Sequence, residues 1–347
     1  MTTRVCRLHA QHDIRIEELP TERPGRGEVL VATGAGGICG SDLHYYQDGG
    51  FGPIRVREPI ILGHEAAGTV IELGEGVEGL AVGDRVAMNP SNPCGACKFC
   101  ARGLYNHCLE MRFRGSAMRM PHEQGLFRDR VAINAAQCVK VGEGISIGEA
   151  ACSEPLAVCV HARAQAGSLS GQSVLVTGSG PIGVLCAALA AEAGAAEVVV
   201  TDLQDVPLKV AEAMGATETI NVATHGARLA DFAADKGHFD TCFECTAAAP
   251  AIRSAIETLH PRGTLVQVGV TGDLPLPVNL LVSKEVNLRG SHRFHPEFAE
   301  AVALINSRII DPRPMITQTF PLEEALQAFE IAGDRSAAVK VQLAFAG

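Results

Sequence analysis

Four closely spaced cysteines are the first residues in this sequence whose types and spacing indicate chemistry. They follow the pattern C-x2-C-x2-C-x7-C at Cys94, Cys97, Cys100 and Cys108. Four thiolates at such short range match a tetrahedral zinc site. A site closed by four sulfurs has no position for a substrate, so we expect this zinc to hold a lobe of the chain together.

A zinc lobe can also bind nucleic acid, and the stretch 98–130 is locally basic. Acidic residues interrupt it, however, and no set of aromatic side chains that could stack on bases accompanies it. The whole sequence carries 29 Lys and Arg against 39 Asp and Glu, a formal net charge of −10. This charge disfavours a polyanionic partner, because nucleic-acid binding depends mainly on neutralising phosphates. We therefore expect no nucleic acid among the partners.

A glycine-rich motif indicates a dinucleotide site. Gly178, Gly180 and Gly183 form G-x-G-x-x-G directly after an apolar run, and a helix is expected to open at the motif. The residues expected to bind the dinucleotide are these glycines with Pro181, Ile182 and Asp202. In this setting the glycines allow a tight turn, a close approach of the backbone to a pyrophosphate, and close packing of helix on strand.

The cofactor expected at this site is NAD. Asp202 ends the next expected strand, where an acid accepts hydrogen bonds from the adenosine ribose and repels a 2′-phosphate. No arginine directly follows Asp202, since the next residues are Leu203, Gln204 and Asp205. The sequence therefore predicts NAD in preference to NADP.

The length and composition set the scale of the molecule. The 347 residues are enough for two domains of ordinary size, and 47% of them are hydrophobic. The sequence has no apolar stretch of the roughly 18 residues that a membrane helix needs, and no signal-peptide core. We expect a cytoplasmic protein without a membrane partner. Its 12 cysteines are then thiols and metal ligands rather than disulfides.

Two patterns of secondary structure must position the motifs. Residues 1–152 hold many turn residues and short alternating runs, which indicates a β-rich domain. Residues 153–288 alternate strands with helices, which predicts an α/β fold with a doubly wound parallel sheet. Residues 289–347 are expected to return to the β-rich domain. Strands are expected at 28–33, 66–72, 174–177, 197–201, 239–244, 265–270 and 338–343, and helices at 182–193, 249–259, 298–307 and 322–332.

Two further segments carry potential metal ligands, CGSDLH at 39–44 and GHE at 63–65. With the four-cysteine lobe and the glycine motif, in this order along the chain, they make the sequence resemble the zinc-containing medium-chain dehydrogenases over essentially its whole length. The resemblance implies a GroES-like catalytic domain beside a Rossmann nucleotide-binding domain, with the active site between them. It also implies two zinc ions per subunit, one catalytic and one structural.

Carried over residue by residue, the resemblance makes Cys39 and His64 direct ligands of the catalytic zinc. Glu65 would be a ligand or an acid beside the ligands, and Glu154 stands where alcohol dehydrogenases of the family have a second cysteine. A Cys/His/Glu/Glu set is similar to that of the polyol dehydrogenases. Whether the two glutamates bind zinc directly or through water stays open.

The resemblance also implies a reaction and a proton path. Zinc lowers the pKa of the substrate hydroxyl, and hydride passes to the nicotinamide ring. Ser41 and His44 match the relay that carries the proton to solvent, and histidine has a suitable pKa for its last step. A non-catalytic relative that keeps the fold and its nucleotide site is the alternative from another class. The intact ligand and relay residues count against it.

The substrate site is expected to be lined by Tyr45, Phe113, Arg293 and Phe294. The segments around these residues look most like the sugar-acid dehydrogenases that convert L-idonate to 5-ketogluconate. A carboxylate substrate requires an arginine, because a guanidinium grips it with two parallel hydrogen bonds. Arg293, Arg112 and Arg114 are the candidates. Oxidation of a neutral polyol such as sorbitol or xylitol is the alternative. Because members of the family form dimers or tetramers, the resemblance also implies a homotetramer or homodimer.

Overall fold

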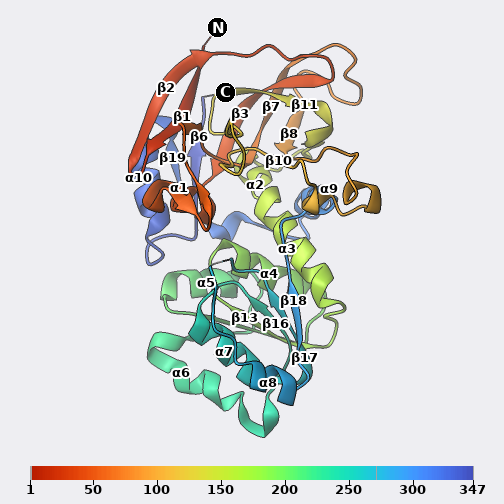
Figure 1. Cartoon of the computed structure of the whole chain (residues 1–347), viewed down its shortest axis with the longest axis vertical. Coiled ribbons are helices and arrows are strands. Elements are labelled where there is room, and N and C mark those ends of the chain that lie inside the picture. Colours follow the sequence, from red (N-terminus) through yellow and green to blue (C-terminus); the bar gives the residue numbers. More distant parts are fainter. Residues whose placement is uncertain (1, 271, 347) are drawn as a thin grey trace.

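The computed structural model describes residues 2–270 and 272–346 and shows two parts stacked along the long axis of the molecule (Figure 1). The part at the top of Figure 1 contains both ends of the chain, and the part below it is formed by the middle of the sequence. None of the helices within the described ranges is both long and apolar enough to cross a membrane.

The upper part is built on a seven-stranded, mostly antiparallel sheet. Its central strand β3 pairs with β7 along most of its length, with β11 over its first half, and with β20 near its end. The late strand β20 therefore lies in the same sheet as strands from the first third of the chain. The strands of this sheet are β3 (Glu28–Gly37), β7 (Glu65–Leu73), β8 (Arg85–Met88), β11 (Arg130–Asn134), β12 (Cys138–Lys140), β19 (Ile316–Pro321) and β20 (Lys340–Ala344).

Smaller sheets complete this part. A three-stranded sheet contains β2 (Asp13–Pro20), β1 (Thr2–Ala10) and β6 (Ile60–Ile61). Two short pairs join β4 (Gly50–Phe51) to β5 (Ile54–Arg55), and β9 (Ser91–Asn92) to β10 (Arg112–Phe113).

The lower part is a six-stranded sheet in which all neighbouring strands are parallel. Numbered by their order in the chain, its strands lie in the order 3-2-1-4-5-6, which confirms the predicted doubly wound sheet. The strands are β13 (Ser173–Thr177), β14 (Glu197–Asp202), β15 (Glu218–Asn221), β16 (Phe239–Glu244), β17 (Leu259–Gln267) and β18 (Asn287–Gly290). The helices that connect them are α4 (Pro181–Glu192), α5 (Asp205–Ala213), α6 (Val222–Asp231), α7 (Ala249–Thr258) and α8 (Val278–Ser283).

The remaining helices surround the sheets of the upper part or join the two parts. They are α1 (Gly40–Asp48), α2 (Ile147–Ala151), α3 (Ser153–Ala166), α9 (Glu297–Asn306) and α10 (Ala325–Gly333). Short 3-10 turns occur at Cys100–Arg102, Tyr105–His107, Ala135–Gln137, Ala234–Lys236, Arg313–Met315 and Leu322–Glu324.

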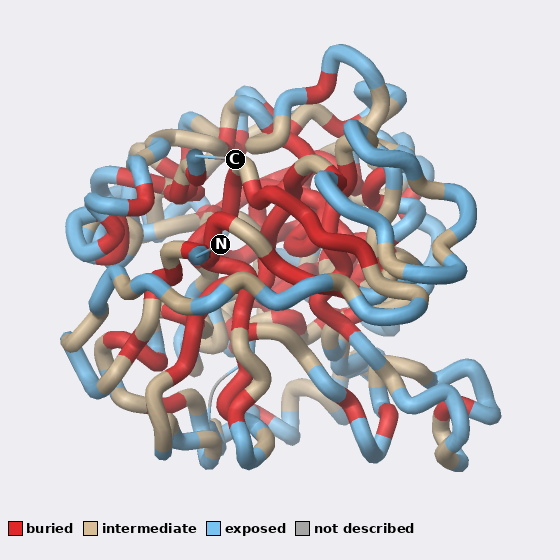
Figure 2. Tube along the Cα trace, turned by 90° about the horizontal axis from the view of Figure 1, so that it is seen from above, coloured by how far each residue is buried: buried red, intermediate tan, exposed pale blue. Residues whose placement is uncertain are grey.

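One apolar core continues from the upper sheet into the lower one. Ala35 of β3 and Ala67 of β7 belong to the same buried cluster as Leu156 of α3 and Val174 of β13. Seen from above in Figure 2, the buried segments gather at the centre of the molecule and the exposed ones form its rim. Because α3 packs into this shared core, burial of apolar surface holds the two parts together.

Most predicted elements coincide with observed ones, and one is displaced. The strand predicted at 265–270 is β17, which begins at Leu259 and ends at Gln267. It ends early because the backbone amides of Val268 and Gly269 both donate to the carbonyl of Glu244, at 2.9 and 2.8 Å. The domain bounds after residues 152 and 288 stay a prediction.

Candidate active site

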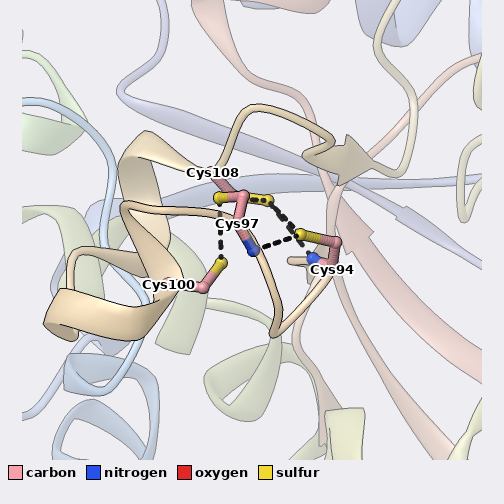
Figure 3. A group of neighbouring side chains, drawn as sticks. All are labelled: Cys94, Cys97, Cys100 and Cys108. Carbon is pink, nitrogen blue, oxygen red and sulfur yellow. Dashed lines mark hydrogen bonds between the residues drawn. The ribbon is translucent and has the colours of Figure 1, made fainter.

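The four predicted cysteines meet in one loop of the upper part (Figure 3). The sulfur of Cys97 lies 3.6 Å from that of Cys100 and 4.0 Å from that of Cys108, and the sulfurs of Cys94 and Cys108 are 3.5 Å apart. A tetrahedron with Zn–S distances of about 2.3 Å places its sulfurs about 3.8 Å apart. The loop thus already has the dimensions of a four-thiolate zinc site.

Backbone amides favour the thiolate form of Cys97, whereas burial raises the pKa of the Cys100 thiol to about 12. The amide of Leu109 lies 3.5 Å from the sulfur of Cys97, and the amide of Cys94 lies 3.2 Å from that of Cys108. Hydrogen bonds from the amides of Cys100 and Leu109 lower the pKa of the Cys97 thiol to about 6. Since zinc binds the deprotonated thiol, the amides around Cys97 favour metal binding by this residue.

A second group forms where β3 ends and β7 begins. The candidate ligand atoms of Cys39, His64 and Glu65 all lie within 4.8 Å of one another, and the latter two residues are buried. Gly63 turns the chain into His64 with a φ of +91°, and a Cβ there would lie 2.1 Å from the ring of Phe127. Sulfur, nitrogen and oxygen from three residues are a donor set that Zn²⁺ takes in catalytic sites.

The carboxylate of Asp42 fixes this group. One oxygen accepts from the amide of Cys39 at 3.1 Å; the other accepts from the amide of Gly63 at 3.2 Å and lies 3.6 Å from Nδ1 of His64. Burial disfavours the imidazolium, but the charges of Asp42 and Cys39 outweigh this effect and raise the pKa of His64 well above its ordinary value. Asp42 thus orients the histidine, as carboxylates commonly do at zinc sites.

Glu65 is held from the other side by Lys340. The ammonium lies 2.8 and 2.7 Å from the two carboxylate oxygens and also donates to the carbonyl of Ile38 at 3.0 Å. The two side chains are only 1% and 2% exposed. Although burial disfavours the ammonium, the Glu65 carboxylate raises the pKa of Lys340. The pair fixes the orientation of Glu65 and leaves part of its lone-pair capacity for a metal.

Glu154 lies in the first turn of α3 and is buried, but it is outside the group whose ligand atoms lie within 4.8 Å. Burial raises the pKa of Glu154 to about 7; nearby His64 lowers it and Glu65 raises it. A bound divalent cation would oppose this rise, because positive charge favours the carboxylate.

The two predicted relay residues lie on α1, directly after Cys39. Ser41 is partly buried in its first turn, and His44 stands one turn further along. The His44 side chain is 48% exposed, lies 2.8 Å from a carboxylate oxygen of Asp48, and stacks on Phe51 at 5.0 Å. A histidine with this exposure can exchange a proton with water.

Two of the predicted substrate residues, Arg293 and Phe113, lie next to His64. The Arg293 guanidinium lies over the ring of Phe113, 4.6 Å from its centre, and this ring lies 5.6 Å from that of His64. Tyr45 is buried, and its hydroxyl accepts from the amide of Ala117 at 3.2 Å.

The other substrate candidates are engaged elsewhere. Phe294 is fully buried and stacks on Phe298, 5.8 Å away. Arg112 forms an ion pair with Glu123, and Arg114 donates to the carbonyl of Ala132 at 3.2 Å. Among the three candidate arginines, only Arg293 is brought by these contacts beside the group of Cys39, His64 and Glu65, the candidate metal-binding group.

The glycine motif lies between β13 and α4, as predicted. Gly178 has a φ of +84°, and a Cβ on Gly183 would lie 1.8 Å from the carbonyl oxygen of Gly178, so both positions require glycine. Gly180 caps the helix that starts with Pro181 and Ile182. The carboxylate of Asp202 accepts from the amides of Ser179 and Leu203 at 2.7 Å and of Gln204 at 3.0 Å.

Comparisons with known proteins agree with this geometry. A family model described as an alcohol dehydrogenase GroES-like domain matches residues 25–143, and one described as a zinc-binding dehydrogenase matches residues 181–307. An L-idonate 5-dehydrogenase (NAD(P)(+)) of Escherichia coli K12 is 38% identical over 344 residues, 99% of each chain. The chain belongs to the zinc-containing medium-chain dehydrogenases.

Other members of this family are similar along the whole chain. A sorbitol dehydrogenase of Gallus gallus is 37% identical, and the match covers 97% of this chain and 94% of the relative. The crystal structure of the E. coli L-idonate 5-dehydrogenase superimposes with a TM-score of 0.95 over 99% of both chains. This zinc-containing medium-chain dehydrogenase is therefore an oxidoreductase of the alcohol and polyol class, with the GroES-like and Rossmann parts that its sequence predicted.

Two residues that hold the candidate metal-binding group in place, Asp42 and Lys340, were not predicted from the sequence. Asp42 stands three residues after the helix cap Cys39, a spacing typical of a capping box, and this was the available signal. Lys340 is 275 residues from Glu65 in the sequence, so no local pattern relates the two.

Proposed function

We propose that this dehydrogenase oxidises a secondary alcohol of a sugar acid, converting L-idonate to 5-ketogluconate with NAD as the acceptor. The position of Arg293 carries this proposal. Its guanidinium lies over Phe113, which in turn lies beside His64. An arginine there can bind a carboxylate with two parallel hydrogen bonds while a hydroxyl of the same molecule reaches the metal-binding group. The 38% identity to an L-idonate 5-dehydrogenase supports the same substrate.

We assign two zinc ions to each chain. The four-cysteine loop would hold a structural ion, and Cys39, His64 and Glu65 would hold a catalytic one, with Glu154 bound directly or through water. A zinc ion held at the second site would supply a Lewis acid beside the substrate hydroxyl, and a bound dinucleotide would supply the hydride acceptor. The ion pair with Lys340 and the hydrogen bonds of Asp42 keep the donor atoms in place before metal arrives.

Ser41 and His44 would carry the proton away. Ser41 is partly buried near Cys39, whereas His44 is half exposed and hydrogen-bonded to Asp48. A hydroxyl followed by an imidazole at the surface can pass a proton from the interior to water. Replacing His44 by Asn should lower kcat and change its pH profile without changing the zinc content.

NAD is the proposed cofactor because of Asp202. Its carboxylate is fixed by three backbone amides at the end of β14, where the adenosine ribose is bound in this fold. A negative charge there repels a 2′-phosphate. Asp202→Ser should therefore raise kcat/KM with NADP relative to NAD.

The test of the substrate is a set of initial rates of NADH formation with L-idonate, D-sorbitol, xylitol and ethanol, each repeated with NADP. A preference in kcat/KM for L-idonate supports the sugar acid. Arg293→Gln should then lower kcat/KM for L-idonate by roughly ten- to hundredfold, the value of a charged hydrogen bond, and change that for sorbitol by much less. The control is Arg112→Gln, since Arg112 is already paired with Glu123.

A neutral polyol is the second candidate substrate. It is favoured by the similarity to sorbitol dehydrogenases, 37% identical in the case of the Gallus gallus enzyme. Faster turnover of sorbitol or xylitol than of L-idonate, unaffected by Arg293→Gln, would establish this alternative.

We also propose that the chain forms a homodimer or homotetramer. The edge strand β18 is exposed at all four residues, and the neighbouring helix α8 exposes Val278 and Val282 by 61% and 71%. An exposed edge with apolar neighbours is suited to pairing with a second copy. Val282→Glu should reduce the mass measured by light scattering, whereas Val82→Glu, at a site 62% exposed in the upper part, should leave it unchanged.

A further inference from the structure

A small pocket lies between the two parts of the molecule, on the side of the glycine motif. Its lower wall is formed by Gly180, Pro181 and Asp202, and its upper wall includes Leu43 and Arg335. The upper wall thus brings a residue of the segment between α10 and β20 to the beginning of helix α4. No pattern in the sequence pointed to Arg335.

The side chain of Arg335 is directed at the middle glycine of the motif. Its Nη1 atom lies 3.6 Å from the place that a Cβ on Gly180 would occupy. No acidic side chain within residues 2–270 and 272–346 forms an ion pair with Arg335, although Asp202 lines the same pocket. The guanidinium is therefore free to bind an anion at this point.

The backbone that carries Arg335 is fixed. The carboxylate of Asp334 accepts from the amide of Ser336 at 2.9 Å and from its hydroxyl at 2.6 Å. The carbonyl of Asp334 also accepts from the amide of Ala338, at 3.2 Å. A guanidinium on such a turn loses less conformational freedom on binding than one on a loose loop.

The glycine loop itself has donors that the protein does not use. Gly180 caps α4 without a side-chain hydrogen bond, so the first amides of the helix are open to an anion. The hydroxyl of Ser179 is fully buried and has no partner among the described residues. Open amides, an unpaired hydroxyl and a guanidinium at one place are suited to phosphate oxygens.

We propose that Arg335 binds the pyrophosphate of the dinucleotide, so that both parts of the chain hold the cofactor. This inference rests on the dinucleotide site of the proposed function. We favour the pyrophosphate over the 2′-phosphate of NADP as the group that Arg335 binds, for two reasons. Arg335 lies next to Gly180, where the backbone approaches the pyrophosphate in this fold, and the negative charge of Asp202 would repel a 2′-phosphate on the ribose.

The experiment measures NADH binding to the zinc-containing enzyme through the fluorescence of NADH itself, which is convenient because the chain has no tryptophan. Competition with ADP-ribose and with adenosine separates the pyrophosphate from the base and sugar. Arg335→Gln should raise the Kd for NADH and ADP-ribose by roughly ten- to hundredfold and leave that for adenosine unchanged. Arg335→Lys, which keeps the charge but not the planar fork, should lie in between.

The control variant is Arg262→Gln. Arg262 is exposed and lies in the first half of β17, whereas dinucleotides bind at the carboxyl ends of the strands. Unchanged NADH affinity in Arg335→Gln would overturn the inference, as would a loss confined to NADPH, which would assign Arg335 to the 2′-phosphate. A lower unfolding temperature with unchanged NADH affinity would also overturn it, because Arg335 would then only join the two parts. If the unmodified enzyme bound no NADH, the proposed dinucleotide site itself would fail.

Discussion

The buried ion pair between Lys340 and Glu65 gives the sharpest test of how the metal-binding group is held. Lys340→Met keeps a long unbranched side chain but removes the charge, which leaves a carboxylate that is 2% exposed without its partner. Removing one member of a buried pair costs about 3–5 kcal/mol. For a cooperative unit of 347 residues, such a loss should lower the unfolding temperature by about 4–7 °C.

Zinc should reduce this loss. With Lys340 gone, the freed carboxylate can still be neutralised by a metal ion bound next to it. Thermal unfolding is therefore measured on zinc-free and zinc-loaded protein, with zinc content determined by mass spectrometry. We expect the difference between Lys340→Met and the unmodified chain to be larger in the zinc-free state, and zinc to stabilise the variant more than the unmodified protein.

A second lysine in the chain provides a matched control. Lys140 and Asp84 lie at the same N–O distance of 2.7 Å, but their side chains are 55% and 24% exposed. Solvent screens such a pair, so Lys140→Met should change the unfolding temperature little. The reasoning is refuted if Lys340→Met and Lys140→Met destabilise the zinc-free protein to the same extent.

Three further predictions concern other parts of the molecule. Cys100→Ser should remove one zinc ion per chain and make the surrounding loop sensitive to protease; an unchanged zinc content would contradict a four-thiolate site. Gly183→Ala places a Cβ 1.8 Å from the carbonyl of Gly178 and should weaken NADH binding at least tenfold, whereas Gly226→Ala, with no atom within 4 Å of the added Cβ, should bind NADH normally. Burial raises the pKa of Glu297, but hydrogen bonds from His161 and from backbone amides together outweigh this effect and lower the pKa to about 2. This group therefore contributes stability that is fully present above its unfolded pKa of about 4.3 and is lost as the pH falls towards 2. Glu297→Gln should therefore lower the unfolding temperature at pH 7, with a difference that shrinks below pH 4; a difference independent of pH would exclude the ionic contribution.

The sequence was sufficient to predict those parts of the candidate site whose residues lie close together in the chain. The four cysteines fall within one loop, and the positions of the glycines follow from a turn that only glycine can make, as the contact of Gly183 with Gly178 shows. For the same reason, the group of Cys39, His64 and Glu65 could be predicted from two short motifs and a family resemblance.

The features that could not be predicted depend on contacts between segments that are far apart in the sequence. Lys340 reaches Glu65 because β20 pairs with β3, a partnership between distant segments that no spacing reveals. The bounds of β17 were misplaced because Pro261 and Gly263 do not suggest a strand, yet the neighbouring strand β16 pairs with residues on both sides of them. Tertiary pairing there overrides local preference.

The late arrival of β20 in the upper sheet has a consequence for biosynthesis. The ammonium of Lys340 binds the carbonyl of Ile38 across 302 residues of chain, so the strand that completes this sheet is made after the whole parallel sheet has been synthesised. Until then the end of β3 is paired with β7 on one side only, while the parallel sheet already has all its strands and can fold on the ribosome. The nascent chain should thus complete its parallel sheet before the contact between Lys340 and Glu65 forms, and the open edge at the end of β3 is where a chaperone would be needed most.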